Sequence, residues 1–318
     1  MNDDIQEIRR LLAPANPSPR GVLAGAGEDA IGRTAFNHIT RAKSVRRGFL
    51  SRRATVRLVT IGGLALVLAA GTTVAQDLVP AGPVANAQVV LTQAANVAQQ
   101  RTFTAPRPEQ WVYTETQYKR LGNPGKGEVL TAESPLRTEL DRLWIRADGK
   151  RLATLVDGKV QVSPTGGGVP PVDYASVAAL PRDPDKLLAW ARENGGPIAE
   201  PDVRPYKVLF GLMLSNGVLP PDLEAATYRA LALIPGIEVD QAAVDDTDRP
   251  VVSISITVEG YLKEEILLDR TTYAYRGHRT TVIKDHTFPE GGTYKAGTVE
   301  SYSVRLATGI VDHSGQRP

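Results

Sequence analysis

The chain has 318 residues, of which 42% are hydrophobic and 23% charged, as in folded proteins, and it contains no cysteine. The lack of cysteine excludes disulfides, thiol catalysis, zinc sites with cysteine ligands and a lipidated N-terminal cysteine. The net charge of +2 is unevenly distributed, because residues 1–57 carry eleven basic and five acidic residues, and the rest carries 26 and 30. A basic head on an acidic body favours a chain that lies in two compartments over a nucleic-acid-binding surface. We therefore expect no nucleic-acid partner.

Residues 1–57 are expected to form a basic cytoplasmic segment of short helices or disordered chain. Near its start, Ile5, Ile8 and Leu11 fall at helical spacing, and prolines follow soon after. A segment of this size is too short to build a core, so it either stays disordered or folds on a partner.

Residues 58–75 predict a transmembrane helix that begins at Leu58 and ends at Ala75. These 18 residues carry no charge, and a helix of that length spans about 27 Å, close to the hydrocarbon thickness of a bilayer. Under the positive-inside rule, the basic flank before the span places the N-terminus in the cytoplasm and the C-terminal region outside. The residues of this flank that set the topology are Arg46, Arg47, Arg52, Arg53 and Arg57. The predicted location is therefore the cell membrane, with a single pass.

Two alternatives to an uncleaved anchor exist for this segment. A buried core helix fits an uncharged run directly after a cluster of arginines poorly. A cleaved signal peptide has a short charged region and an apolar run of about 7–15 residues, whereas 57 residues precede a longer run here. We expect the anchor to stay attached.

After a linker at residues 76–83, residues 84–312 are expected to form one extracytoplasmic domain, followed by a tail at 313–318. It opens with a helix over 84–100, whose apolar residues share one face. Strands are predicted at 111–119 and 140–146. Two tight turns, at Asp148-Gly149 and Asp157-Gly158, then give a three-strand meander over about 139–163.

Three helices and a second set of strands follow the meander. Asp183 and Pro184 form an N-cap and first-turn pair for one helix, and helices are also predicted at about 205–215 and 221–234. Residues 252–258 alternate between aliphatic and polar side chains, which indicates an antiparallel strand with one buried and one polar face. The predicted fold class is α+β: one transmembrane helix, then a curved antiparallel sheet covered by helices.

Few residues point to catalysis or metal binding. His278, His286 and Asp285 flank the end of a strand, where exposed side chains of these types are ordinary. Asp245, Asp246 and Asp248 resemble the start of a calcium loop, but the required glycine and terminal glutamate are missing, which favours a solvated turn. No motif of a hydrolase, metalloprotease or phosphate-binding loop is present. We expect a non-enzyme without metal or cofactor.

Aromatic residues on the first strands give the candidate ligand site. Trp111, Tyr113 and Trp144 are predicted to line an apolar groove inside a curved sheet, closed by the helices of residues 184–234. Such a groove suits an acyl chain or a peptide. The alternative is that the three side chains are core residues, which is the more common role of tryptophan.

The order of predicted elements resembles the lipoprotein-carrier fold, a curved antiparallel half-barrel covered by helices. That fold occurs in periplasmic lipoprotein carriers, mycobacterial lipid-binding lipoproteins and the outer domain of a sigma-E regulator. The likeness covers about residues 84–312 and implies a binding domain. Unlike the mycobacterial lipoproteins, this chain has no cysteine to lipidate.

The chain also resembles a family of uncharacterised single-pass actinobacterial membrane proteins. The resemblance is carried by residues 8–14 (IRRLLAP), 108–113 (PEQWVY), 180–184 (LPRDP) and 228–236 (YRALALIPG). Members often lie beside genes for extracytoplasmic-function sigma factors, which implies a role in sensing or in restraining a sigma factor. The zinc-type anti-sigma motif His-x-x-x-Cys-x-x-Cys is absent, so any contact of the cytoplasmic segment with a sigma factor would use another mode.

Together these observations predict a membrane-anchored binding or sensory protein. Its outer domain would hold a lipid or protein ligand, and its cytoplasmic segment would contact a regulator such as a sigma factor. The alternative is an envelope carrier or scaffold whose cytoplasmic segment only orients the anchor. An enzyme with an unrecognised site ranks last.

Overall fold

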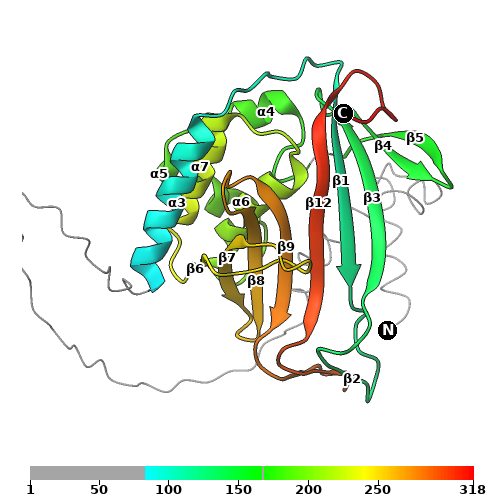
Figure 1. The fold of residues 1–318 in the computed structure, drawn as a ribbon, viewed down its shortest axis with the longest axis vertical. Helices are drawn as coiled ribbons and strands as arrows, with labels where there is room; N and C mark the ends of the chain where they lie inside the picture. Colours follow the sequence, from blue (N-terminus) through cyan, green and yellow to red (C-terminus); the bar gives the residue numbers. More distant parts are fainter. Residues whose placement is uncertain (1–82, 167) are drawn as a thin grey trace, which may run out of the picture.

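An antiparallel sheet forms most of the computed structural model, which describes residues 83–166 and 168–318 (Figure 1). Its nine strands follow the order β5-β4-β3-β1-β12-β9-β8-β7-β6. The bounds are β1 Trp111–Arg120, β3 Arg137–Arg146, β4 Arg151–Val156, β5 Lys159–Pro164, β6 Glu238–Asp240, β7 Val251–Val258, β8 Leu262–Asp269, β9 Tyr275–Val282 and β12 Val299–Val311. A small second sheet holds β2 Val129–Leu130, β10 His286–Thr287 and β11 Thr293–Tyr294.

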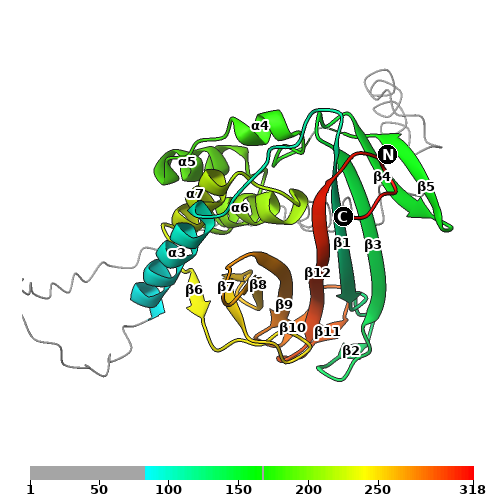
Figure 2. The same cartoon turned by 45° about the horizontal axis from the view of Figure 1, so that its top comes forward.

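The helices gather towards the β6–β9 end of the sheet, and the β4–β5 hairpin projects at the other end (Figures 1 and 2). Their bounds are α3 Pro83–Gln99, α4 Tyr174–Ala178, α5 Pro184–Asn194, α6 Val203–Ser215 and α7 Pro221–Leu231. The predicted α+β class, with a large antiparallel sheet covered by helices, is confirmed for the described residues.

Local signals in the sequence explain where α5 begins and how the meander turns. The Asp183 side chain accepts a hydrogen bond from the Lys186 backbone N–H at 2.9 Å, and Pro184 occupies the first helical position. At the β4–β5 turn, Asp157 and Gly158 both have positive φ, 48° and 75°, as a two-residue hairpin of type I′ requires. The predicted N-cap and hairpin are confirmed.

The centre of the sheet joins strands from the two ends of the described region. β1 pairs with β3 on one side and with β12 on the other, from Trp111 opposite Val311 to Arg120 opposite Ser301. The register between β1 and β12 shifts at Glu115 and Thr116, where the pairing has a bulge.

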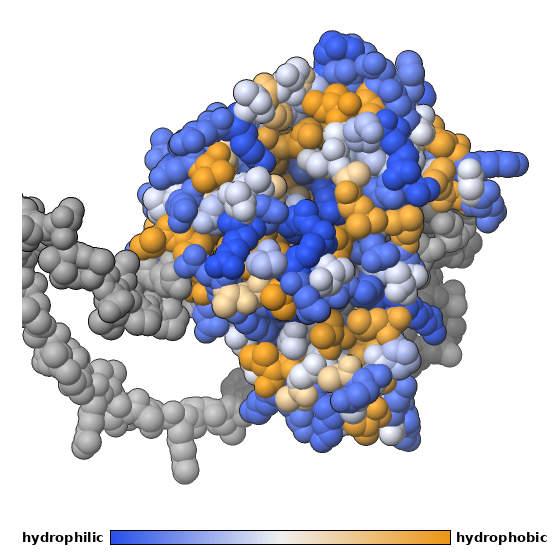
Figure 3. Space-filling view, viewed as in Figure 1, coloured by the Kyte–Doolittle hydropathy of each residue, from blue (hydrophilic) through white to orange (hydrophobic). Residues whose placement is uncertain are grey.

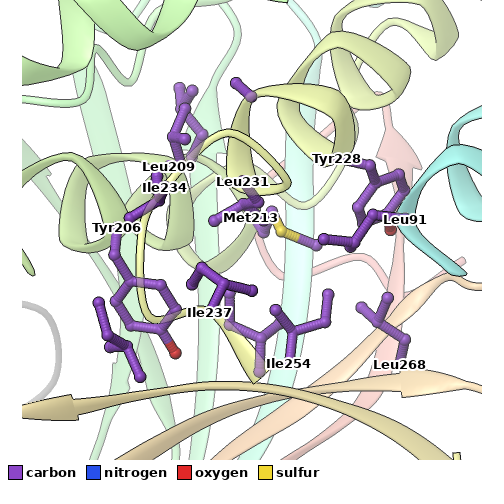
Figure 4. Packing of buried hydrophobic residues seen from close by; sticks show 14 of the residues in the cluster. Leu91, Tyr206, Leu209, Met213, Tyr228, Leu231, Ile234, Ile237, Ile254 and Leu268 are labelled. Atoms are coloured by element: carbon purple, nitrogen blue, oxygen red, sulfur yellow. The ribbon is translucent and has the colours of Figure 1, made fainter. Parts of the chain in front are cut away.

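The main core lies between the helices and strands β6–β9. Figure 4 shows Ile254 of β7 and Leu268 of β8 facing helix residues that include Met213, Tyr228 and Leu231. All five side chains are buried. Burial of such side chains stabilises a fold by about 1.5–3 kcal/mol each, so this layer anchors the helices to the sheet.

The predicted polar face of β7 is itself covered. Ser253 and Ser255 lie on this face, and both are buried. The Ser253 hydroxyl donates to Glu265 Oε1 at 2.8 Å, and Arg279 pairs with the same carboxylate. Residues 241–250 reach this side of the sheet, because Arg279 also donates to the Val244 carbonyl. The alternation was predicted correctly, but its polar face is covered by chain.

The predicted membrane anchor lies outside the described residues. This holds for the span from Leu58 to Ala75, for the arginines that flank it and for the rest of the predicted cytoplasmic segment. In the part of the chain that the structure describes, no helix has both the length and the apolar character needed to cross a membrane.

Candidate functional site

The predicted groove residues form a packed cluster. Trp111, Tyr113 and Trp144 are 8%, 0% and 1% exposed, and the rings of Tyr113 and Trp144 lie 5.0 Å apart. Ala153 and Val311 complete the cluster. Buried to this extent, the three aromatic residues have the core role that the sequence left open as the alternative.

This cluster lies on the face of the sheet that points away from the helices. Side chains alternate along a strand, and Gly217, just after α6, lies against Val112 and Thr114 of β1. Tyr113 therefore points to the opposite side. There the C-terminal segment covers the sheet, and the Trp144 indole Nε1 donates to the Gln316 carbonyl at 2.6 Å. We call this side the outer face and the helix-facing side the inner face.

A buried carboxylate ties the C-terminal segment to the outer face. Glu115 accepts hydrogen bonds from the Tyr113 hydroxyl and from Arg317 Nη2, each at 2.5 Å, and pairs with Arg142. Burial alone would raise the pKa of Glu115, but the Tyr113 hydrogen bond and the two arginines outweigh it and lower the pKa. The residues of the predicted tail are thus part of the folded structure.

The candidate site is a cleft of about 240 Å³ on the inner face. It lies where the chain after α3, the end of α6 and the start of α7 meet strands β9 and β12. Apolar side chains make part of its wall, and two arginines are the charged donors among its lining residues. The residues that line the cleft include Arg101, Phe103, Met213, Leu219, Glu224, Tyr275 and Arg305.

Arg305 is a buried cation held in a fixed position. The residue is 9% exposed, its Nε donates to Thr116 Oγ1 at 3.1 Å, and its Nη2 donates to the Leu214 carbonyl at 2.6 Å. Its guanidinium also lies over the Tyr275 ring, 5.2 Å from the centroid. All of these partners are neutral, and no carboxylate of the described residues forms an ion pair with Arg305.

The second arginine of the cleft is paired. Arg101 Nη2 forms an ion pair with Glu224 Oε2, and Glu224 is 7% exposed. The Nε of Arg101 is buried and has no hydrogen-bond partner among the described residues. The Arg101 side chain as a whole is 36% exposed, so part of its guanidinium is open to the cleft.

An acidic residue near Arg305 shows how poorly this side of the sheet is solvated. Asp141 of β3 lies opposite Thr116 in the β1–β3 ladder. Burial raises its pKa to about 6, although the positive charges of Arg120 and Arg305 act in the other direction.

A serine and a histidine also meet on the inner face. Ser303 Oγ lies 2.7 Å from His278 Nδ1, and it also accepts from the His278 backbone N–H at 3.2 Å. A nucleophilic serine and its general base lie within such a hydrogen-bond distance of each other. Ser303 is fully buried, however, so its hydroxyl has no access to a substrate. The pair links β9 to β12.

The other residues singled out in the sequence have structural partners. Asp245 accepts from Thr247 and Arg249; burial opposes these hydrogen bonds, which nevertheless lower the pKa of Asp245 to about 2. The turn is solvated as predicted, since residues 246–250 are exposed, and only Asp245 within it is buried, at 5% exposed. Asp285 pairs with Lys295, and the His286 ring stacks on Tyr261. Across residues 83–166 and 168–318, no group of three His, Cys, Asp or Glu side chains is arranged to hold a metal ion.

Sequence reasoning missed the residues of the cleft. Arg101, Glu224 and Arg305 come from three distant segments, and no local motif joins them. The face seen in Figure 3 mixes hydrophilic and hydrophobic residues, and its apolar areas are separated by polar ones. The buried cation of Arg305 therefore identifies the site more clearly than a sequence motif or a surface patch does.

Comparisons with known proteins give distant matches of fold only. No family model matches the chain, and no curated protein matches it. Among solved structures, the crystal structure of MucB in complex with MucA(peri) is 13% identical, covers 73% of this chain and 59% of that one, and has a TM-score of 0.27. The MucA/MucB complex of Pseudomonas aeruginosa is 14% identical, with coverages of 73% and 58% and a TM-score of 0.27. A LolA superfamily protein from Nitrosomonas europaea, NE2245, is 6% identical, with coverages of 71% and 94% and a TM-score of 0.19.

This chain therefore spans about three fifths of the MucB chains that it matches. At these TM-scores the likeness is too loose to carry an argument about function.

Proposed function

We propose that this protein is a single-pass, membrane-anchored binding and sensory protein. Its outer domain binds a small anionic ligand with an apolar part in the cleft on the inner face. The observation that carries the proposal is Arg305, a buried guanidinium whose protein partners are neutral and which lines the cleft.

The charge of Arg305 supports an anionic ligand. A cation that is removed from water loses several kcal/mol of solvation, and hydrogen bonds to a hydroxyl and a carbonyl replace only part of that loss. A carboxylate or phosphate in the cleft would supply the missing negative charge, in a site where weak solvation strengthens the attraction. The planar guanidinium also suits two-pronged binding to either group.

The size and walls of the cleft limit the rest of the ligand. A volume of about 240 Å³ lies below the roughly 300–1,000 Å³ that is typical of pockets for drug-sized ligands, so the cleft suits a smaller ligand. Phe103, Met213 and Leu219 offer apolar contact beside the two arginines. A short amphiphile with one anionic end fits this combination, and a large polar molecule does not.

The sequence supports the remaining parts of the proposal. The uncharged segment from Leu58 to Ala75 would anchor the chain in the cell membrane, and the arginines before it would keep the N-terminus in the cytoplasm. The cytoplasmic segment would contact a regulator, for which a sigma factor is our first candidate. Binding rather than catalysis is proposed, because the Ser303–His278 pair is closed to substrates. Recovery of the full chain from membranes, with its N-terminus protected from external protease, tests the anchor.

Ligand binding is tested with the full-length chain in zwitterionic lipid nanodiscs. Isothermal titration calorimetry with hexanoate and with hexyl phosphate distinguishes a carboxylate from a phosphate preference, and hexan-1-ol is the uncharged control. We expect saturable binding of at least one anion. Arg305→Leu should weaken that binding about 30-fold, or about 2 kcal/mol, because the charge contact is lost.

Arg151→Leu is the matched control, since Arg151 is an exposed residue of the projecting β4–β5 hairpin. It should leave the affinity unchanged. Equal hexanoate affinities for the wild type and Arg305→Leu, or equal binding of hexan-1-ol, would contradict the proposal.

A further inference from the structure

We infer that the Arg101–Glu224 ion pair couples occupancy of the cleft to the docking of α3 on α7, so that a bound anion loosens α3. The inference rests on the proposed function, because it requires an anion in the cleft. It adds a regulatory role to that site: the same arginine that meets the ligand also fixes the helix that leads back towards the predicted anchor.

Arg101 is attached to the C-terminal end of α3 by a backbone hydrogen bond. The Arg101 backbone N–H donates to the Ala98 carbonyl at 3.2 Å, so the residue continues the last turn of the helix. Its guanidinium, and the side chains of Thr102 and Phe103, line the cleft. A ligand that displaces the Arg101 side chain therefore perturbs the C-terminal end of α3.

Glu224 depends on Arg101 for its charge partner. Glu224 is buried near the start of α7, and its Oε1 lies 3.0 Å from the Tyr228 hydroxyl. The same hydroxyl lies 2.5 Å from the Tyr273 carbonyl, and it has a single proton to donate. The Glu224 carboxylate therefore shares that proton with a carbonyl, and Arg101 is the cation that pairs with it.

An anion in the cleft would compete with Glu224 for Arg101. The Arg101 side chain lines the cleft and is 36% exposed, so its guanidinium is within reach of a ligand while it pairs with Glu224. A ligand oxygen that binds the accessible part of the guanidinium would weaken the ion pair with Glu224. Glu224 would then remain buried with a weaker counter-charge, which destabilises the junction of the two helices.

Small side chains make up most of the buried surface of α3. The buried residues of α3 are mostly small, namely Ala87, Val90, Leu91, Ala94, Ala95 and Ala98. An alanine buries one methyl group, so each contributes little. The polar contacts besides the ion pair come from Arg229 of α7, which donates to Asn96 at 3.1 Å and to Gln99 at 3.0 Å on the exposed side.

Hydrogen–deuterium exchange of the full-length chain in nanodiscs tests the coupling. With saturating hexanoate, or hexyl phosphate if that is the anion bound, the amides of α3 should exchange about fivefold faster, the lower end of typical allosteric couplings. Hexan-1-ol at the same concentration should have no effect. Slower or unchanged exchange in α3, in protein that calorimetry shows to be saturated, would overturn the inference and leave the proposed function intact. An absence of saturable binding would instead overturn the proposed function.

Two variants separate the ion pair from general loosening of α3. Glu224→Gln should raise exchange in α3 without ligand and remove the further increase when an anion binds. Arg229→Gln breaks contacts to α3 outside the cleft, so exchange should rise without ligand while the anion-dependent increase persists. If Glu224→Gln keeps the full anion-dependent increase, the coupling does not run through this pair.

Discussion

The two faces of the β1–β3–β12 part of the sheet bury charge in opposite ways. On the outer face, Glu115 is enclosed by a tyrosine hydroxyl and two arginines, and its pKa is lowered. On the inner face, burial raises the pKa of Asp141 to about 6, and Arg305 forms no ion pair with the described carboxylates. The buried carboxylate of the outer face is paired with arginines of the chain, whereas the buried guanidinium of Arg305 on the inner face has no carboxylate partner among the described residues.

This difference separates structural residues from candidate binding residues. Large aromatic side chains such as Trp144 attract attention in the sequence, but here they pack against the C-terminal segment and have their hydrogen bonds satisfied. A buried group that the protein itself satisfies needs no ligand. Arg305 on the other face, whose positive charge is not paired with a carboxylate of the described residues, is the better indicator of the ligand.

The largest expected effect comes from removing an outer-face aromatic residue. Trp144→Ala deletes a ring that is 1% exposed together with its hydrogen bond to Gln316, and should lower the free energy of unfolding by about 4 kcal/mol. Urea unfolding of the full chain measures this. Anion affinity of the folded protein, titrated without urea, should stay unchanged. A variant of normal stability that fails to bind the anion would reverse the roles we assign to the two faces.

A single outer-face hydroxyl should have a smaller effect of the same sign. Tyr113→Phe keeps the ring and removes the hydroxyl that donates to Glu115 at 2.5 Å. Hydrogen bonds to charged groups contribute about 1.5–3 kcal/mol, so we expect a loss of about 2 kcal/mol in urea unfolding at pH 7. The loss should shrink as acid protonates the carboxylate. If Tyr113→Phe is as stable as the wild type, Glu115 is satisfied by its arginines alone.

The smallest effect should have the opposite sign. A carboxyl whose pKa is raised on folding destabilises the native state above that pKa, and the penalty vanishes below the pKa of the unfolded chain. For Asp141 the window runs from about pH 4 to about pH 6. Asp141→Asn should therefore stabilise the protein by about 1 kcal/mol at pH 7.5, a value reduced because Asp141 is only half-buried, and by much less at pH 4. Thermal unfolding at the two pH values would show it, and a destabilised variant at pH 7.5 would contradict it.

Much of the architecture was predictable from local signals in the sequence. The Asp183-Pro184 start of α5 and the Asp157-Gly158 turn follow from backbone preferences that need no tertiary context. The pairing of β1 with β12 did not follow, because nothing local connects strands that are separated by nearly the whole described region. Nor does alternation alone reveal which face of a strand meets the helices, and the aromatic residues of β1 and β3 lie on the other face.

The cleft was beyond sequence reasoning for a related reason. Arg305 alternates with Tyr302, Val304 and Leu306, so its position reads as part of a polar, solvated face. The bulge in the β1–β12 pairing and the position of Leu214 at the end of α6 place its guanidinium under a helix instead. Arg101 and Glu224 become partners only because α3 docks on α7.

The pairing of β1 with β12 also has a consequence for how the chain folds. The central strands of the sheet are the first and the last of the domain, so the sheet cannot close until residues 299–311 are available. Contacts between such distant segments form slowly, because a long loop must close first. Until β12 arrives, the meander of β1, β3, β4 and β5 has an open edge at β1, which would be a site for mispairing with other chains. Completion of the sheet is thus tied to the synthesis of residues 299–311.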